Sequence, residues 1–269
     1  MTKIKDFFKK HWIDMIVITV VIALLALLCA SIYVQFNFEK KLNIFYKNFI
    51  DNEGYKEVLK GLGNTATIAV LGLIIGIVIG TFIAVIKVIP PYKRIVRYMQ
   101  KAVSIYVAFF RGTPIVVQLL VGYFIIFPLL RMKIAPVDAS VWIFGLNSGA
   151  YISEIMRGGI NSVDKGQLEA ARAVGMPFST SMLKIVVPQA VKNILPTLGN
   201  EFIALIKETS VVGYVGAVDV TMAFQYLGSS SYEYMIPYLV MALIYIILVA
   251  GISLIVKIIE RKLAKSERQ

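Results

Sequence analysis

The sequence contains one cysteine, Cys29, and one histidine, His11. A disulfide needs two cysteines, and structural zinc sites draw on several Cys or His ligands. A disulfide framework, a cysteine-based metal site and a histidine triad are therefore excluded. The sequence also lacks a G-x-x-x-x-G-K-[ST] pattern, the loop that cradles nucleotide phosphates in P-loop ATPases, so we expect this chain to bind no ATP, Mg²⁺ or other cofactor itself.

Charged residues are also scarce, at 16% of the 269 residues against 58% hydrophobic residues. Soluble domains average about 25% charged and about 45–50% apolar residues. The chain is too apolar for a disordered protein, and no Gly- or Ser-rich linker divides it. The composition predicts an all-α membrane protein that is solvated mostly by lipid.

Six stretches are apolar enough over the roughly 20 residues that a membrane helix needs. Arg111-Gly112-Thr113-Pro114 interrupts the third stretch, which predicts a helix, a bend and a span that starts at Ile115. The fifth stretch contains Lys207 and Glu208, which we expect near its inner end. The six predicted spans are Met15 to Val34, Thr67 to Val88, Ala102 to Leu130, Ala139 to Ile160, Phe202 to Phe224 and Ile236 to Ile259.

The formal net charge of +12 would suggest nucleic acid as the partner of a soluble protein, but in a membrane protein it fits cationic cytoplasmic loops. With the N-terminus inside and six spans, eighteen Lys and Arg fall inside and seven outside. This asymmetry predicts that both termini are cytoplasmic and that nucleic acid is not a partner. The seven outer residues are Lys40, Lys41, Lys47, Lys56, Lys60, Arg131 and Lys133.

Three glycines in the second span, Gly72, Gly76 and Gly80, follow one another at four-residue spacing. Positions four apart lie on one face of a helix, and glycine allows a second helix to approach closely. The pattern predicts tight helix packing and no chemistry.

The inner loop after the fourth span contains the sequence Gly166-Gln167-Leu168-Glu169-Ala170-Ala171-Arg172-Ala173-Val174-Gly175. Residues 169–173 are good helix formers, and Gly175 stands where a C-terminal cap belongs, which predicts a short helix that ends there. The small side chains of this helix fit insertion into the cleft of a partner. They fit a solvated surface equally well.

The order of motifs in this loop resembles the EAA loop of permease subunits of ATP-binding cassette importers of type I. The loop carries Glu169-Ala170-Ala171, Gly175, Ile185 and Pro188 at that family's spacing, with Val187 where Leu is usual. Over residues 60–265 the chain further resembles the polar amino acid branch of these importers, and Glu208 replaces a more common Asp. The additional motifs are Phe110-Arg111-Gly112-Thr113-Pro114, Gln118, Gly149-Ala150-Tyr151, Glu154, Arg157-Gly158, Gly166-Gln167, Pro188-Gln189-Ala190, Pro196, Asn200 and Lys207-Glu208-Thr209-Ser210.

The resemblance implies a five-helix core with one extra N-terminal helix. Residues 1–60 would form a cytoplasmic tail, this extra helix and an outer loop, and residues 61–265 the permease domain, with the coupling loop at about 164–200. The apolar run of the extra helix, about 20 residues, exceeds the 7–15 of a signal peptide, so we expect no cleavage there. The residues that couple the permease to the ATPase would be Glu169, Ala170, Ala171 and Gly175.

The resemblance also implies a non-enzymatic subunit in a bacterial cell membrane. Its partners would be two copies of an ATPase that binds ATP and Mg²⁺, a second identical or homologous permease, and an extracytoplasmic binding protein. The substrate would be a polar amino acid, either a cationic one such as Arg, Lys or His, or Gln.

Ionisable groups inside membrane spans are costly unless they are paired or face water, so they mark candidate substrate contacts. Asn147, Tyr151 and Glu154 share one face of the fourth span. Arg111 and Gln118 would share another face if the helix continued through Pro114. The expected substrate contacts are Arg111, Gly112, Thr113, Gln118, Asn147, Tyr151 and Glu154, and Lys207 with Glu208 is expected to form a gate or a structural ion pair.

Structural alternatives exist for these residues. Glu154 could pair with Arg157 three positions later, and Arg111 could cap carbonyls at the break. Asp219 is expected near the outer surface, in solvent. An ion-coupled secondary transporter with its ion site at the break is the alternative function, and a membrane scaffold without a transport path is another.

Overall fold

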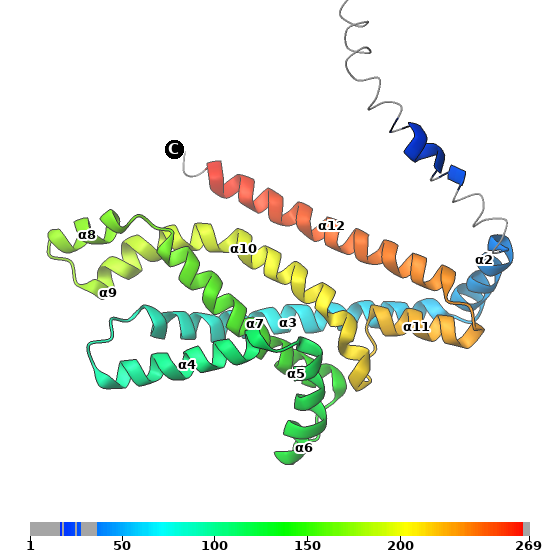
Figure 1. Ribbon diagram of the computed structural model, residues 1–269, viewed down its shortest axis with the longest axis horizontal. Coiled ribbons are helices and arrows are strands. Elements are labelled where there is room, and N and C mark those ends of the chain that lie inside the picture. The colour runs from blue at the N-terminus through cyan, green and yellow to red at the C-terminus, as the bar shows by residue number, and fades with distance from the viewer. Residues whose placement is uncertain (1–16, 18, 25, 28–36, 266–269) are drawn as a thin grey trace, which may run out of the picture.

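The computed structural model describes residues 17, 19–24, 26–27 and 37–265. Every regular element within these residues is helical, which confirms the all-α class. Most helices lie side by side along one direction, whereas α5 and α6 point away from this bundle (Figure 1). The main helices are α2 (Phe38–Tyr46), α3 (Gly54–Val88), α4 (Arg94–Gly112), α5 (Ile115–Val121), α6 (Phe127–Leu129), α7 (Pro136–Asn161), α8 (Lys165–Ala173), α9 (Phe178–Ser181), α10 (Val187–Glu208), α11 (Val220–Ser231) and α12 (Met235–Lys265).

Four short helical segments of other geometry connect some of these helices. The π-helical turns η1 (Lys47–Asp51), η2 (Gly122–Ile126) and η3 (Met182–Val186) follow α2, α5 and α9, and the 3-10 helix η4 (Thr209–Val215) follows α10. The helical path from α9 through η3 to α10 is therefore continuous over residues 178–208.

The glycine stripe of α3 packs against α7, as the spacing predicts. A Cβ atom on Gly76 would lie 2.9 Å from the Cβ of Ser148, and one on Gly80 would lie 2.7 Å from Cγ2 of Ile152. Gly145 of α7 in turn receives Ile75 of α3. Glycines on both helices therefore accept side chains from the other, and the two backbones approach closely.

Gly80→Leu should destabilise this helix pair. The new side chain would meet Ile152 and the backbone nitrogen of Ser153, 2.9 Å from the position of its Cβ, and overpacking typically costs about 1–3 kcal/mol. We expect a lower thermal unfolding midpoint for the detergent-solubilised protein. Gly63→Leu is the matched control, because Gly63 lies in the same helix with no atom within 4 Å of its Cβ position. Equal midpoints for the two variants would contradict the packing argument.

The predicted bend at Pro114 is confirmed. Thr113 has φ −123° and ψ 144°, the extended conformation that a following proline favours. The helix axis turns by 107° between α4 and the segment from α5 to α6.

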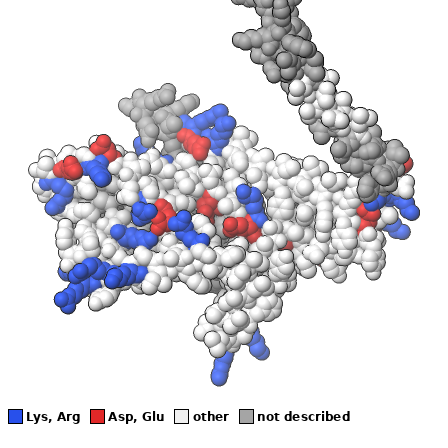
Figure 2. Space-filling model, in the orientation of Figure 1, with Lys and Arg blue, Asp and Glu red and all other residues white. Residues whose placement is uncertain are grey.

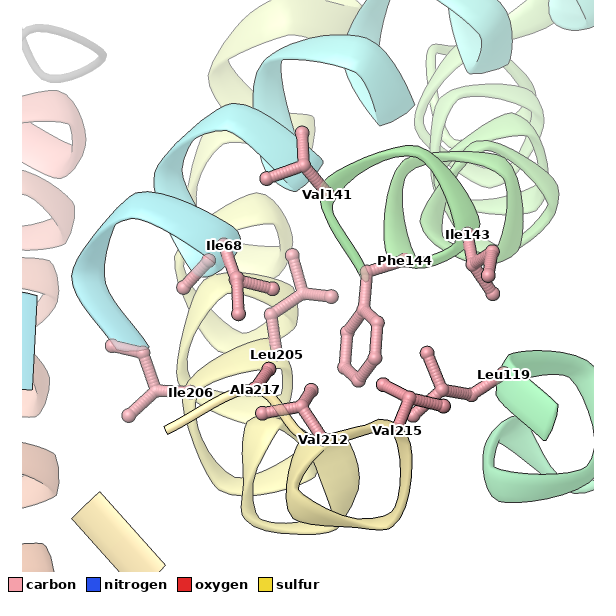
Figure 3. Close-up of a cluster of buried hydrophobic side chains, with 11 residues drawn as sticks. Ile68, Leu119, Val141, Ile143, Phe144, Leu205, Ile206, Val212, Val215 and Ala217 are labelled. Atoms are coloured by element: carbon pink, nitrogen blue, oxygen red, sulfur yellow. The ribbon is translucent and has the colours of Figure 1, made fainter. Parts of the chain in front are cut away.

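A central cluster of buried apolar side chains joins the bend to the rest of the bundle (Figure 3). Phe144 of α7 is fully buried and lies between Leu119 of α5 and Leu205 of α10. Val212 and Val215 of η4 also belong to this cluster. The core therefore holds the bend, α7 and the end of α10 in a fixed arrangement.

The fifth predicted span, Phe202 to Phe224, is wrong. The continuous helix over residues 178–208 ends in η4, and Gly216 has φ +84°, a left-handed conformation that stops the helical path before α11 begins. Glu208 therefore lies at the end of α10 remote from α8, not near the start of a span. The apolar run extends over the end of α10, η4 and the start of α11, so hydropathy located the end of none of these elements.

The second predicted span is a longer helix than expected. α3 has 35 residues, which at about 1.5 Å each exceed the roughly 30 Å of a hydrocarbon core. Its first turns contain Lys56 and Lys60, which lie before the predicted start of the span at Thr67. The predicted boundary between residues 60 and 61 consequently falls inside this helix.

Within the described residues, fewer helices than the predicted six are long and apolar enough to span a membrane. Only α3 and α12 are long and apolar enough, and α4 with the α5–α6 segment makes a third if the bent pair counts as one span. Polar residues interrupt α7 and α10. Most of the first predicted span, Met15 to Val34, lies outside the described residues, so the number six stays a prediction.

Candidate functional site

The break between α4 and α5 is held by two buried amides. Gln118 Nε2 donates to the carbonyl of Phe110 at 2.8 Å, to the carbonyl of Thr113 at 3.0 Å and to its Oγ1 at 2.8 Å. Asn147 Nδ2 of α7 donates to Gln118 Oε1 at 2.9 Å and to the same Phe110 carbonyl at 3.3 Å. Carbonyls that a broken helix frees therefore gain partners from side chains. Gln118 and Asn147, not Arg111, cap the break.

Arg111 lies at the end of α4 and faces α7 instead. Its guanidinium carbon is 5.4 Å from the centre of the Tyr151 ring, a cation–π geometry. Gly112 and Thr113 follow it at the exposed side of the break, and Thr113 Oγ1 donates to the carbonyl of Phe109 at 2.9 Å. The structure therefore brings Arg111 against Tyr151, just as it brings Gln118 against Asn147, whereas in the described part of the chain no hydrogen bond or ion pair joins Glu154 to these break residues.

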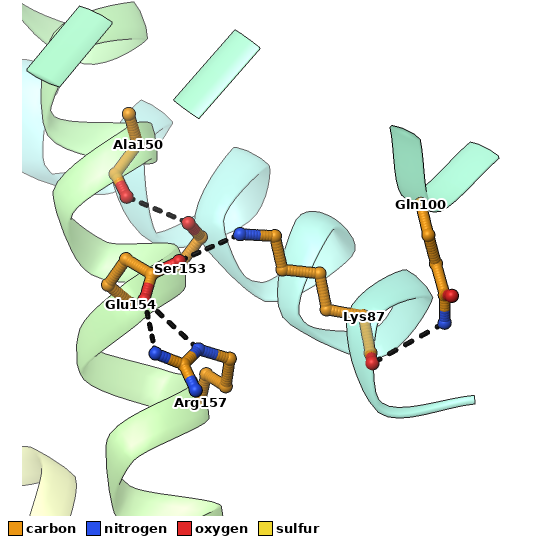
Figure 4. A network of polar contacts seen from close by, with 6 residues as sticks. All are labelled: Lys87, Gln100, Ala150, Ser153, Glu154 and Arg157. Atoms are coloured by element: carbon orange, nitrogen blue, oxygen red, sulfur yellow. Dashed lines mark hydrogen bonds and ion pairs between the residues drawn. The ribbon is translucent and has the colours of Figure 1, made fainter. Parts of the chain in front are cut away.

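Glu154 is paired with two cations (Figure 4). Lys87 Nζ reaches from the end of α3 to Glu154 Oε1 at 2.7 Å, and Arg157 Nη2 approaches Oε2 at 2.7 Å. The predicted pairing with Arg157 is confirmed. The Glu154 side chain is 20% exposed and that of Lys87 15%, so this is a largely buried contact between α3 and α7.

Lys207 and Glu208 form no ion pair with each other or with another residue in the described part of the chain. Lys207 lines a groove of about 540 Å³ together with Tyr245 and Ile246 of α12. Glu208 is half-buried. The expected ion pair is therefore not formed, and a gating role stays a prediction.

Asp219 is not solvated, contrary to the expectation. Its side chain is fully buried and accepts hydrogen bonds from the backbone nitrogens of Thr221 at 3.0 Å and Met222 at 2.9 Å. It is the N-cap of α11, a position that a carboxylate favours. Asp219 is accordingly a structural residue.

The predicted loop helix is α8, and it ends as expected. Gly175 has φ +85°, its backbone nitrogen donates to the carbonyl of Arg172 at 3.0 Å, and that of Met176 donates to Ala171 at 3.1 Å. This pair of bonds is the Schellman arrangement, in which glycine takes the left-handed position. Asp164 caps the other end by accepting from Gly166 N at 2.6 Å.

The predicted coupling residues divide between the two faces of α8. Ala171 is 4% exposed, whereas Glu169, Ala170 and Gly175 are exposed. Leu168 of the same helix packs against the apolar cluster of Val163, Val186, Ala190 and Ile194. Next to Gly175, Val174 is 79% exposed. Figure 1 places α8 and α9 at one end of the bundle, opposite α2 and α11. This end therefore presents small and apolar side chains.

Two charged residues of the site escaped the sequence analysis. Lys87 stands at the end of an apolar run. Its partner Glu154 is 67 positions away, so no local sequence pattern indicates the pair. Glu201 accepts a hydrogen bond from Ser148 Oγ at 2.8 Å. It precedes the predicted span at Phe202 by one residue, so a span placed earlier would have included it.

Residues 72–265 match the family described as "Binding-protein-dependent transport system inner membrane component". A putative glutamine transport system permease protein of Rickettsia typhi is 41% identical over 206 residues, 77% of this chain and 92% of that protein. The arginine transport system permease protein of Bacillus subtilis is 40% identical over 212 residues, 78% of this chain and 94% of that protein.

Solved structures agree with these relatives. The crystal structure of an amino acid ABC transporter with histidines matches with a TM-score of 0.71 and 37% identity, over 77% of this chain and 94% of that chain. A bacterial alginate ABC transporter matches with a TM-score of 0.61 over 97% of this chain and 98% of that chain. At 17% identity, the second match shows the fold alone.

Proposed function

Since the chain belongs to the family of binding-protein-dependent transport system inner membrane components, we propose that it carries polar amino acids into the cytoplasm and is driven by a separate ATPase. It is a permease subunit of an ATP-binding cassette amino acid importer, because relatives at 41% and 40% identity are described as a putative glutamine permease and an arginine permease, and a structural neighbour is an amino acid ABC transporter. An ion-coupled secondary transporter has no support among these matches.

The helix α8 is the observation that carries the coupling proposal. Its Schellman end fixes where the helix stops, and Glu169, Ala170 and Gly175 are exposed beside the apolar Val174. Val174 stands between Ala173 and Gly175, so this end of α8 offers small and apolar side chains that a partner could cover without steric hindrance. The half-buried Leu168 packs against the cluster that contains Val186 of η3 and Ala190 of α10, so a displacement of α8 would be transmitted through η3 to α10.

The proposed assembly contains two such permeases, identical or homologous, two ATPase subunits and an extracytoplasmic binding protein. ATP and Mg²⁺ would be bound by the ATPase. Among the described residues no group of three or more His, Cys, Asp or Glu side chains is arranged for a metal ion. Both termini would lie in the cytoplasm of a bacterial cell, on the α8 side, and the charge asymmetry of the loops supports this orientation.

The proposed substrate path runs along the face of α7 that carries Tyr151. Arg111, Gly112 and Thr113 border this face at the break, and Glu154 stands one turn from Tyr151, towards α8. Gln118 and Asn147 would act by holding the break in its bent form. The exposed position of Arg111 next to Tyr151 supports contact with an anionic group such as a carboxylate.

Uptake by the intact complex in proteoliposomes tests this function. With the ATPase and binding protein present and ATP supplied on the ATPase side, we expect accumulation of arginine, glutamine or another polar amino acid. Without ATP, or with an ATPase that cannot hydrolyse it, accumulation should stop even when proton or sodium gradients are imposed. Uptake driven by an ion gradient in the absence of the ATPase would refute the proposal.

A further inference from the structure

One exposed stripe of α4 begins with cations and continues with apolar side chains. Arg94, Tyr98, Lys101 and Ile105 follow one another three or four residues apart, so they lie on one face of the helix. All four are exposed, Tyr98 by 67% and Ile105 by 71%. Val107, on the opposite face, is buried in an apolar cluster with residues of α3 and α7. The α4 stripe therefore points away from the bundle.

The cations at the start of α4 have no anionic partner within the described chain. Lys93 is the N-cap of the helix, Arg97 lies one turn further, and both are exposed like Arg94 and Lys101. None of the four forms an ion pair with a described residue. Residues 58–137 contain no Asp or Glu. Figure 2 shows a blue patch over the start of α4, with no red beside it on this face. The charge of this cationic patch is thus left for a partner.

The turn between α3 and α4 holds the cationic patch in place. Gln100 Nε2 of α4 donates to the carbonyl of Ile86 at 3.1 Å and to that of Ile89 at 2.8 Å, at the end of α3. The turn itself contains Pro90 and Pro91, whose rings restrict the backbone. The patch consequently lies at the end of a fixed helical hairpin, at the same end of the bundle as α8 and α9 (Figure 1).

The order of side chains along the α4 stripe matches an anionic phospholipid. Clusters of Lys and Arg at the end of a membrane helix attract anionic headgroups. Beyond them, Ile105 and Phe109 are 71% and 56% exposed, as expected for contact with acyl chains. A soluble anion or an acidic protein surface would leave this apolar part uncovered. A second copy of the chain, docked stripe against stripe, would place like charges opposite one another.

We propose that the α4 stripe is a binding site for an anionic phospholipid such as phosphatidylglycerol. Its phosphate lies at Arg94, Arg97 and Lys101, and one of its acyl chains follows Ile105 and Phe109. The lipid belongs to the leaflet at the α8 end of the bundle, which is the cytoplasmic leaflet in the proposed orientation. The site does not depend on which amino acid the permease carries.

Quenching of a single permease tryptophan by brominated lipids tests the site. Trp12 and Trp142 are replaced by Phe, and I105W then places one tryptophan on the stripe. The permease–ATPase complex is reconstituted in vesicles of phosphatidylcholine and phosphatidylglycerol, with bromine on the acyl chains of only one of them. The complex without I105W is the blank for tryptophans of the ATPase. We expect phosphatidylglycerol to be preferred about fivefold, which corresponds to about 1 kcal/mol.

Two sets of variants show whether the cations cause this preference. The combined change R94Q, R97Q and K101Q removes exposed side chains and should lower the preference to less than about twofold, whereas R94K with R97K keeps the charge and should retain most of it. L239W in place of I105W is the matched control. Leu239 is 50% exposed on α12 and has no Lys or Arg within two turns in sequence, so it should show no preference.

The outcomes separate this site from other partners and from the transport function. An undiminished preference after the three Gln changes would overturn the proposal, and so would an equal preference at L239W, because the attraction would then not be local. Loss of the ATPase from the Gln variant would assign the patch to the ATPase and also overturn it. Absence of ATP-driven uptake by the unaltered complex would refute the function and leave the lipid site standing.

Salt provides a test that needs no change of the cations. Raising the ionic strength from about 0.15 M to about 1 M shortens the Debye length from about 8 Å to about 3 Å. The preference at I105W should therefore fall as salt is added, even where the Gln variant cannot be purified. A preference that does not change with salt would contradict an electrostatic site.

Discussion

Glu169→Arg is expected to detach the ATPase from this permease and to reduce ATP-driven amino acid uptake by about tenfold or more. Glu169 is an exposed carboxylate on α8, in the motif that resembles the coupling loop of this importer class. Reversing a charge in a docked contact leaves a partner group unpaired, which typically costs about 2–5 kcal/mol. A loss of about 1.4 kcal/mol already corresponds to a factor of ten in binding.

The measurement is co-purification of the ATPase with the tagged permease, together with uptake in proteoliposomes. Glu57→Arg is the matched control, since Glu57 is an exposed glutamate near the start of α3, remote from α8. The control should retain the ATPase at the unaltered level. An intact complex with full uptake in the Glu169 variant would show that this side chain does not take part in docking.

Glu154→Gln is expected to lower the stability of the permease by about 3 kcal/mol and to weaken uptake of all amino acids equally. The change leaves Lys87 without its carboxylate in a contact where both side chains are at most 20% exposed. Removing one partner of a buried ion pair costs about 3–5 kcal/mol, and the partial exposure of this pair favours the lower end. The loss would act through the α3–α7 contact rather than through the substrate.

Thermal unfolding of the solubilised protein and uptake of arginine and glutamine measure this effect. The double variant Lys87→Met with Glu154→Gln should recover part of the stability, because no unpaired cation is then left between the helices. Glu57→Gln disrupts only an exposed pair with Lys60 at 3.9 Å and should cost less than about 1 kcal/mol. A selective loss of arginine uptake at unchanged stability would instead assign Glu154 to a cationic substrate.

Features that depend on neighbouring residues could be predicted from the sequence. Pro114 restricts the backbone of Thr113, and Gly175 adopts a conformation that other residues resist, so the bend and the end of α8 follow from local sterics. The stripe of Gly72, Gly76 and Gly80 predicts close packing for the same reason. Such features are encoded within one or two helical turns.

Errors arose where hydropathy was the only guide. The apolar run from Phe202 to Phe224 covers the end of α10, η4 and the start of α11, because lipid-facing and protein-facing segments have similar composition. Asp219 was expected in solvent, because the sequence does not distinguish a buried N-cap carboxylate from an exposed one. Only packing distinguishes them.

The amino-acid sequence alone determined the all-α membrane class, the bend at Pro114, the end of α8 and the resemblance to an importer subunit. The tertiary structure decided which charges are compensated. Glu154 meets Lys87 from 67 positions away, Ser148 meets Glu201 from 53, and Arg111 meets Tyr151 across the break. The physical reason is that such pairings depend on how each helix is rotated and placed against its neighbours, which the residues of one helix do not specify.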